Sequence, residues 1–166
     1  MLVFKDAITR ETKVKVTDFG YSTITVGESG LVSLPKSRPW NAPEHHFGGF
    51  KADKAKKTDV YSFGMLCLWV LFENRLSDFP QTTADGVTGL ISFDVPFFRS
   101  RPTLLECLKN EGRLEYIANN LLGSMPGLNA EFATHLKEIF SLALAHNPEK
   151  RTCHLARVIG LFSKKK

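Results

Sequence analysis

The sequence predicts a mainly α-helical domain that begins with a short β-hairpin. Near the start, basic and apolar residues alternate over Lys13–Thr17, as in a strand with one buried face. Most of the second half carries apolar residues at helical spacing instead. Strands and helices do not alternate along the chain, which argues against a parallel sheet. A chain of 166 residues, 43% of them hydrophobic, is long enough to bury one core.

The hairpin is expected within residues 1–17. Leu2–Phe4 and Lys13–Thr17 have the composition of strands, and the polar residues Lys5–Thr12 would form the loop between them. Tyr21–Arg38 is rich in Ser, Thr and Gly and shows little periodicity, which predicts a long loop. Loops of that length inside a compact domain are usually functional or disordered.

The helical subdomain is expected over residues 56–163. Thr58 and Asp59 are predicted to cap a helix that runs to about Phe72 and is apolar on nearly every face, hence buried all round. The other predicted helices are Thr103–Asn110, Leu114–Leu122, one that starts near Asn129, and Thr152–Phe162. No motif accounts for the polar segment Ser77–Phe98.

Composition excludes several classes of function. The three cysteines are far apart and form no Cys-x-x-Cys pair, so neither a disulfide framework nor a zinc site is expected, and Cys67 should be a small core residue. Aromatic residues do not interleave with the lysines, so no nucleic-acid partner is expected. Val60–Phe72, the longest uncharged apolar segment, is too short to span a bilayer. We therefore expect no membrane association and a cytoplasmic or nuclear location.

Four motifs then follow one another along the chain. The tripeptide Asp18-Phe19-Gly20 follows a predicted strand and opens the long loop, and Ala42-Pro43-Glu44 stands at the loop's far end. The string from Asp59 to Gly64 begins the predicted buried helix, and Asn147–Arg151 precedes the last one. In this order and spacing the motifs resemble the large, C-terminal lobe of a protein-kinase catalytic domain, serine/threonine or tyrosine-kinase-like, entered just after its catalytic loop.

The resemblance implies a role for each residue near the long loop, with residues 18–44 as the activation segment. Asp18 would be the carboxylate that holds Mg²⁺ against the phosphates of ATP. Phe19 would be the apolar lever beside it, and Gly20 would allow the loop to swing. Ser37 stands where serine/threonine kinases place a Thr beside the substrate hydroxyl. Leu2 would form the floor under the adenine ring, unless it is only a core leucine of an edge strand.

Other implied roles are structural. Glu44 is expected to form a buried ion pair with Arg151, which would join the end of the loop to the penultimate connection. Ala42 and Pro43 belong to the same motif as Glu44. In the family the leading Asp of the central helix, here Asp59, also holds the catalytic loop in place, and Gly64 closes that string.

The printed sequence contains no Gly-x-Gly-x-x-Gly and no His-Arg-Asp, so a catalytic base, a phosphate clamp and the ATP-binding Lys are not among its motifs. No residue is therefore assigned as catalytic. We expect the 166-residue chain to be a single partial domain (1–166), a fragment or a gene model started at an internal Met. Alone it should neither bind ATP and Mg²⁺ tightly nor transfer phosphate. Its expected partners are a protein substrate or the missing N-terminal lobe.

Two other interpretations stay open. The chain would be a non-catalytic kinase-like scaffold if it binds a partner through its helical face. It would be an unrelated helical interaction module if the motifs are coincidental, and in that case Glu44 and Arg151 should lie far apart.

Overall fold

The computed structural model describes residues 2–5, 8–10, 12–15, 30–46, 49–73, 75, 81–82, 88–89 and 102–161. Within these ranges α-helices dominate, and the strands form only two-stranded antiparallel sheets. The prediction of a mainly α-helical fold is therefore confirmed.

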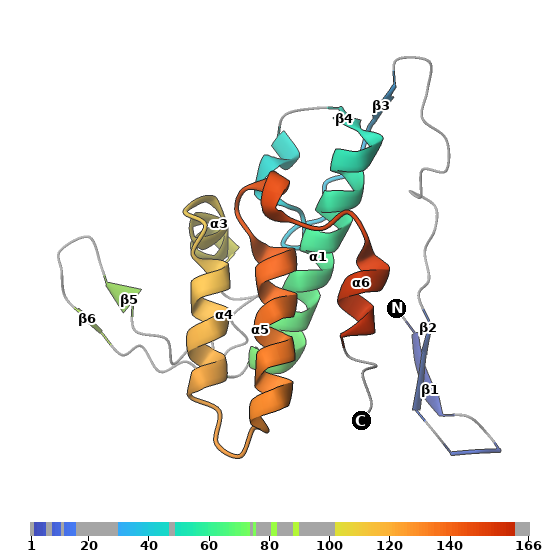
Figure 1. Ribbon diagram of the computed structural model, residues 1–166. Coiled ribbons are helices and arrows are strands. Elements are labelled where there is room, and N and C mark those ends of the chain that lie inside the picture. Colours follow the sequence, from blue (N-terminus) through green and yellow to red (C-terminus); the bar gives the residue numbers. More distant parts are fainter. Residues whose placement is uncertain are drawn as a thin grey trace.

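The longest helix, α1 (Ala52–Phe72), lies in the middle of the helical bundle (Figure 1). Helix α5 (Ala130–Leu144) packs along α1, and α4 (Leu114–Gly123) packs on α5. Two shorter helices, α3 (Pro102–Asn110) and α6 (Leu155–Gly160), complete the bundle. Each predicted helix is thus present, with shifted ends.

Side chains from all of these helices meet in one core. Its largest fully buried members include Tyr61 and Phe72 of α1, Leu105 of α3, Ile117 of α4 and Phe140 of α5. Cys67 also lies in this core, as predicted. Burying so many aliphatic and aromatic side chains is the main term that holds the helices together.

Helix α5 begins where the sequence places it. The Asn129 side chain accepts hydrogen bonds from the backbone N–H groups of Glu131 (2.9 Å) and Phe132 (3.3 Å), which caps the helix. Its apolar positions then face the core, except that Phe132 remains 41% exposed.

Helix α1 begins at Ala52, so the prediction that Thr58 and Asp59 cap it was wrong. The Thr58 hydroxyl donates to the carbonyl of Ala55 inside the helix (2.7 Å), and the N-cap is Lys51, which makes no side-chain capping bond. The extra turn forms because the residues before Thr58 are mostly strong helix formers. Ala55 is also buried, in a small cluster with Val32 and Phe50.

The prediction that this helix is buried all round was wrong as well. Four residues at helical spacing line one side of α1, which we call the outer face: Asp59, Phe63, Leu66 and Val70. Asp59 is exposed, Phe63 and Leu66 are half-buried, and Val70 is 63% exposed. Although α1 carries this apolar run, no helix in the described part of the chain is long and apolar enough to cross a membrane.

The predicted hairpin is present: β1 (Leu2–Lys5) pairs antiparallel with β2 (Thr12–Lys15), with Leu2 opposite Lys15. A second pair was not predicted. Strand β3 (Leu31–Val32) lies within the expected long loop and pairs with β4 (Phe50–Lys51). The loop prediction was therefore wrong at these two residues, because their strand depends on a partner almost 20 residues away.

Two further differences concern segments with weak local signals. The segment Ser77–Phe98 contains the short pair β5 (Gln81–Thr82) and β6 (Thr88–Gly89). Helix α6 starts at Leu155, three residues later than expected, because the Thr152 side chain accepts from the backbone N–H of His154 (3.1 Å) and holds a turn there.

Candidate functional site

The end of the long loop is fixed to the core at Ala42-Pro43-Glu44. Pro43 begins a 3-10 helix, η1 (Pro43–His46), and both Ala42 and Pro43 are buried. The Trp40 ring lies edge-on to Trp69 of α1, with ring centroids 5.8 Å apart. These contacts hold the segment against α1, so the side chain of Glu44 projects from a defined position.

Before this anchor the chain makes a tight turn. The Ser37 carbonyl accepts hydrogen bonds from the backbone N–H groups of Trp40 (2.8 Å) and Asn41 (3.1 Å). The side chains of Ser37 and Arg38 are exposed on this turn. A partner molecule can therefore reach the Ser37 hydroxyl.

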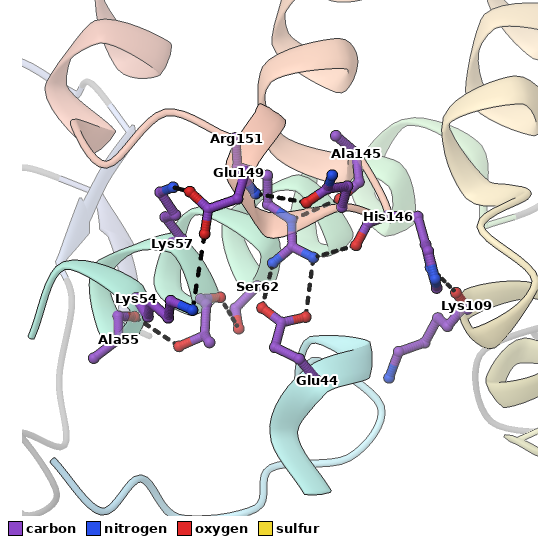
Figure 2. Close-up of polar contacts among 12 residues, drawn as sticks. Glu44, Lys54, Ala55, Lys57, Ser62, Lys109, Ala145, His146, Glu149 and Arg151 are labelled. Carbon is purple, nitrogen blue, oxygen red and sulfur yellow. Dashed lines mark hydrogen bonds and ion pairs between the residues drawn. The ribbon is translucent and has the colours of Figure 1, made fainter. Parts of the chain in front are cut away.

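The ion pair expected between Glu44 and Arg151 is present (Figure 2). The two guanidinium Nη atoms of Arg151 donate to the two carboxylate oxygens of Glu44, at 2.6 Å and 3.0 Å. Arg151 follows a second 3-10 helix, η3 (Pro148–Lys150), whose first turn is capped by Asn147. The Arg151 side chain is 0% exposed and that of Glu44 17%. Two segments 107 residues apart are thus joined by a bidentate contact.

Arg151 uses its other donors as well. Its Nε atom donates to the carbonyl of Ala145 (2.6 Å), and Nη2 also donates to the carbonyl of His146 (3.0 Å). The guanidinium carbon lies 4.6 Å from the centroid of the Tyr61 ring, a cation–π distance. Burial raises the pKa of the Tyr61 hydroxyl, so this residue stays neutral beside the ion pair. Among the described residues, the guanidinium of Arg151 therefore contacts one carboxylate, two backbone carbonyls and the face of one aromatic ring.

A second, exposed ion pair lies next to the first. Lys57 Nζ donates to Glu149 Oε2 at 2.9 Å, and Lys54 Nζ lies 3.9 Å from Glu149 Oε1 (Figure 2). The hydrogen bond from Lys57 lowers the pKa of the Glu149 carboxyl. Because Glu149 is largely exposed, this contact adds little to the stability of the fold.

Lys109 of α3 is fully buried, although no motif singled it out. Its Nζ atom donates to the carbonyl of Pro39 (3.0 Å) and contacts both carboxylate oxygens of Glu106 (3.2 and 3.4 Å). Lys109 thereby ties α3 to the turn that carries Ser37. The sequence held a signal, because Lys109 stands four residues after Leu105 and so lies on the same, core-facing side of α3.

Lys109 gives a pH-dependent prediction. Burial lowers its pKa from the usual 10.5, so the folded protein releases this proton at a lower pH than the unfolded chain does. Stability from this group is constant below the folded pKa and rises as the pH climbs from there to 10.5. Denaturant unfolding of the wild type and of Lys109→Met should be measured over the alkaline range. The free energy of unfolding of the wild type should rise relative to that of the variant as the pH increases.

The Glu106 carboxylate opposes that lowering of the Lys109 pKa. Replacing it in Glu106→Gln should therefore move the rise in stability to lower pH. A difference between wild type and Lys109→Met that stays constant over the alkaline range would show that Lys109 does not titrate in this way.

The remaining predicted site residues are spread over the chain. Asp18, Phe19 and Gly20 lie outside the described residues. Leu2 is in β1, and its side chain is outside the described part of the chain. Gly64 lies where α1 packs closely against Ala143 and Leu144 of α5.

Asp59 lies on the outer face of α1, where its neighbours shield it enough for partial burial to raise the pKa of its carboxyl. Among the side chains that are described, no three His, Cys, Asp or Glu residues gather as metal ligands. The magnesium ligand expected at position 18 is not among those side chains.

Comparison with known proteins gives one similarity to a kinase. No family model and no solved structure matches the chain. The dual specificity protein kinase shkD of Dictyostelium discoideum is 48% identical over 58 residues, which are 34% of this chain and 7% of that kinase. This stretch is similar to part of a protein kinase. The chain therefore shares sequence with a small fraction of the relative's length.

Proposed function

We propose that this chain forms the helical large lobe of a protein-kinase-like domain, which in complete form transfers phosphate from ATP to protein hydroxyls. The observation that carries the proposal is the bidentate contact between Glu44 and Arg151. It joins the two segments that the kinase resemblance pairs, although they are 107 residues apart. The similarity to a Dictyostelium protein kinase supports the same interpretation.

In this proposal the reacting groups gather around the start of the long loop. Asp18 would hold Mg²⁺, which would supply the positive charge that neutralises the phosphates of ATP. By the resemblance, Leu2 would lie under the adenine ring, and Phe19 and Gly20 would set the position of Asp18. These residues bind and orient the nucleotide, and the catalytic base comes from a polypeptide segment that the printed sequence does not contain.

The outer face of α1 is where a segment with those motifs would dock in this proposal. It presents a carboxylate, Asp59, at one end and three apolar side chains below it. A carboxylate can accept hydrogen bonds from the backbone or from an arginine of a docked loop. The apolar residues gain stability when a second polypeptide removes them from water.

The turn at Ser37 supports a proposal for the substrate class. Serine/threonine kinases place a Thr beside the substrate hydroxyl at the position that Ser37 takes here. Ser37 is exposed, and a hydroxyl side chain at this position favours serine and threonine as the substrate residues. The Dictyostelium relative is named a dual specificity kinase, so tyrosine is the second class to test.

The test is a chimaera. The small lobe and catalytic loop of an active protein kinase are joined immediately before Met1, and residues 1–166 of this chain follow. With Mg²⁺ and radiolabelled ATP we expect phosphate transfer to a generic protein substrate. Asp18→Asn should abolish the transfer because it removes the metal ligand, whereas Asp53→Asn, an exposed carboxylate in the first turn of α1, should leave it unchanged.

Two further arms make the result decisive. The 166-residue chain alone should show no transfer, because its printed sequence lacks the groups named above. A chimaera that unfolds cooperatively on heating but transfers no phosphate would contradict the catalytic proposal. It would favour the second candidate, a non-catalytic scaffold, for which the exposed Val70 on the outer face of α1 is the supporting observation.

A further inference from the structure

A groove of about 460 Å³ lies on the side of Glu44 that faces the start of α1. Its apolar wall comes from the second strand pair and from η3, through Leu31, Phe50 and Pro148. Leu31 is 48% exposed although it is a large apolar side chain. The volume is within the range of roughly 300–1,000 Å³ that is usual for ligand sites.

The backbone of Gly49 shapes the floor of this groove. A Cβ atom at this position would lie 3.2 Å from Leu31 Cβ, closer than most such contacts. The glycine therefore lets the Leu31 side chain lie directly against the backbone. An extended peptide can approach here without meeting a side chain from position 49.

The edge of the groove is basic. Lys51 and Lys54 both line it and both are exposed. Of the acidic side chains nearby, Glu44 is paired with Arg151 and Glu149 with Lys57 at 2.9 Å, and the exposed Asp53 does not line the groove. No described acidic side chain pairs with Lys51, and Lys54 makes only a long, exposed ion pair with Glu149, at 3.9 Å. The positive charge at this edge is thus available to a ligand.

We propose that this groove binds an acidic, extended peptide of a partner protein. An apolar side chain of the peptide contacts Leu31 and Pro148, and its neighbouring carboxylates pair with Lys51 and Lys54. The charge of the groove selects an acidic ligand. The aromatic residue in the wall, Phe50, is only 7% exposed and offers no surface on which a nucleic-acid base could stack. This docking proposal does not depend on kinase activity.

The experiment uses fluorescence anisotropy on the full 166-residue chain. The probe is a fluorescein-labelled synthetic octapeptide in which glutamate and leucine alternate, and the comparison peptide has lysine in place of glutamate. We expect the acidic peptide to bind and the basic one not to bind. The double variant Lys51→Glu, Lys54→Glu should weaken binding by about tenfold, since two surface charge pairs become repulsive.

A matched control separates this site from the overall charge of the protein. Lys137→Glu with Arg157→Glu changes the net charge by the same amount on exposed positions of α5 and α6, and it should leave the affinity unchanged. Leu31→Ser should weaken binding several-fold by removing the apolar contact. Amide NMR signals of Gly49 and Phe50 should shift on titration with the acidic peptide.

Three results would overturn the proposal. One is equal loss of binding in the control double variant, which would show attraction to net charge only. Another is tighter binding of a single-stranded RNA oligonucleotide or of vesicles of anionic lipid than of the peptide. The third is absence of any anisotropy change at millimolar protein.

Discussion

Replacing Arg151 with methionine is expected to lower the free energy of unfolding by roughly 3–5 kcal/mol. The change leaves the Glu44 carboxylate without its partner in a site where it is 17% exposed. It also leaves the carbonyls of Ala145 and His146 without the donors that now bind them. Urea denaturation followed by circular dichroism, at neutral pH and 25 °C, measures the difference directly.

Three comparison variants sharpen this prediction. Lys57→Met removes one partner of the exposed ion pair with Glu149 and should cost at most about 1 kcal/mol. Combining Arg151→Met with Glu44→Gln should recover part of the loss, because no uncompensated charge remains. Arg151→Lys keeps the charge but loses the bidentate geometry, so its free energy of unfolding should lie between those of the wild type and Arg151→Met. If Arg151→Met costs no more than Lys57→Met, the buried pair is not what holds these two segments together.

The second large effect is expected for Gly64→Ala, which should destabilise the fold by roughly 1–3 kcal/mol. A Cβ atom at position 64 would lie 2.8 Å from Ala143 Cβ and 2.9 Å from Leu144 Cδ2. Ala143 has no flexible side chain that could move aside, so α1 and α5 must separate. Thermal and urea unfolding of the purified variant measure the cost.

The chain supplies its own control for this glycine. Gly123, at the end of α4, has no atom within 4 Å of the position that a Cβ would take. Gly123→Ala should therefore be neutral or stabilise the protein slightly, since alanine loses less backbone entropy than glycine on folding. Adding Ala143→Gly to Gly64→Ala should relieve the close contact and restore part of the stability. Equal effects of Gly64→Ala and Gly123→Ala would rule out the contact with α5 as the cause.

The ion pair and the glycine both determine how the end of the long loop sits against the helices. Glu44 and Arg151 attach the end of the long loop to the segment after α5, and Gly64 sets how closely α5 lies to α1. Both features place the Ala-Pro-Glu motif relative to the central helix. The position of Ser37 depends on both features, because its turn leads directly into that motif.

Local patterns in the sequence predicted that each helix exists, although not where α1 and α6 begin. The apolar positions of α5 recur at helical spacing and its cap, Asn129, is a strong local signal, so both its existence and its start were predicted. The motif pairing of Glu44 with Arg151 was also predicted, from resemblance rather than from spacing. Neither inference needed knowledge of what each segment packs against.

Only the tertiary structure decided the rest. Strand β3 exists because Val32 pairs with Phe50 and both pack with Ala55 in a small buried cluster. Lys109 is buried because the carbonyl of Pro39 and the carboxylate of Glu106 converge on it. The physical reason is the same in each case. The contacts that stabilise β3 and Lys109 are made by residues distant in sequence. A helix such as α5, in contrast, is predicted by apolar residues that lie three and four positions apart.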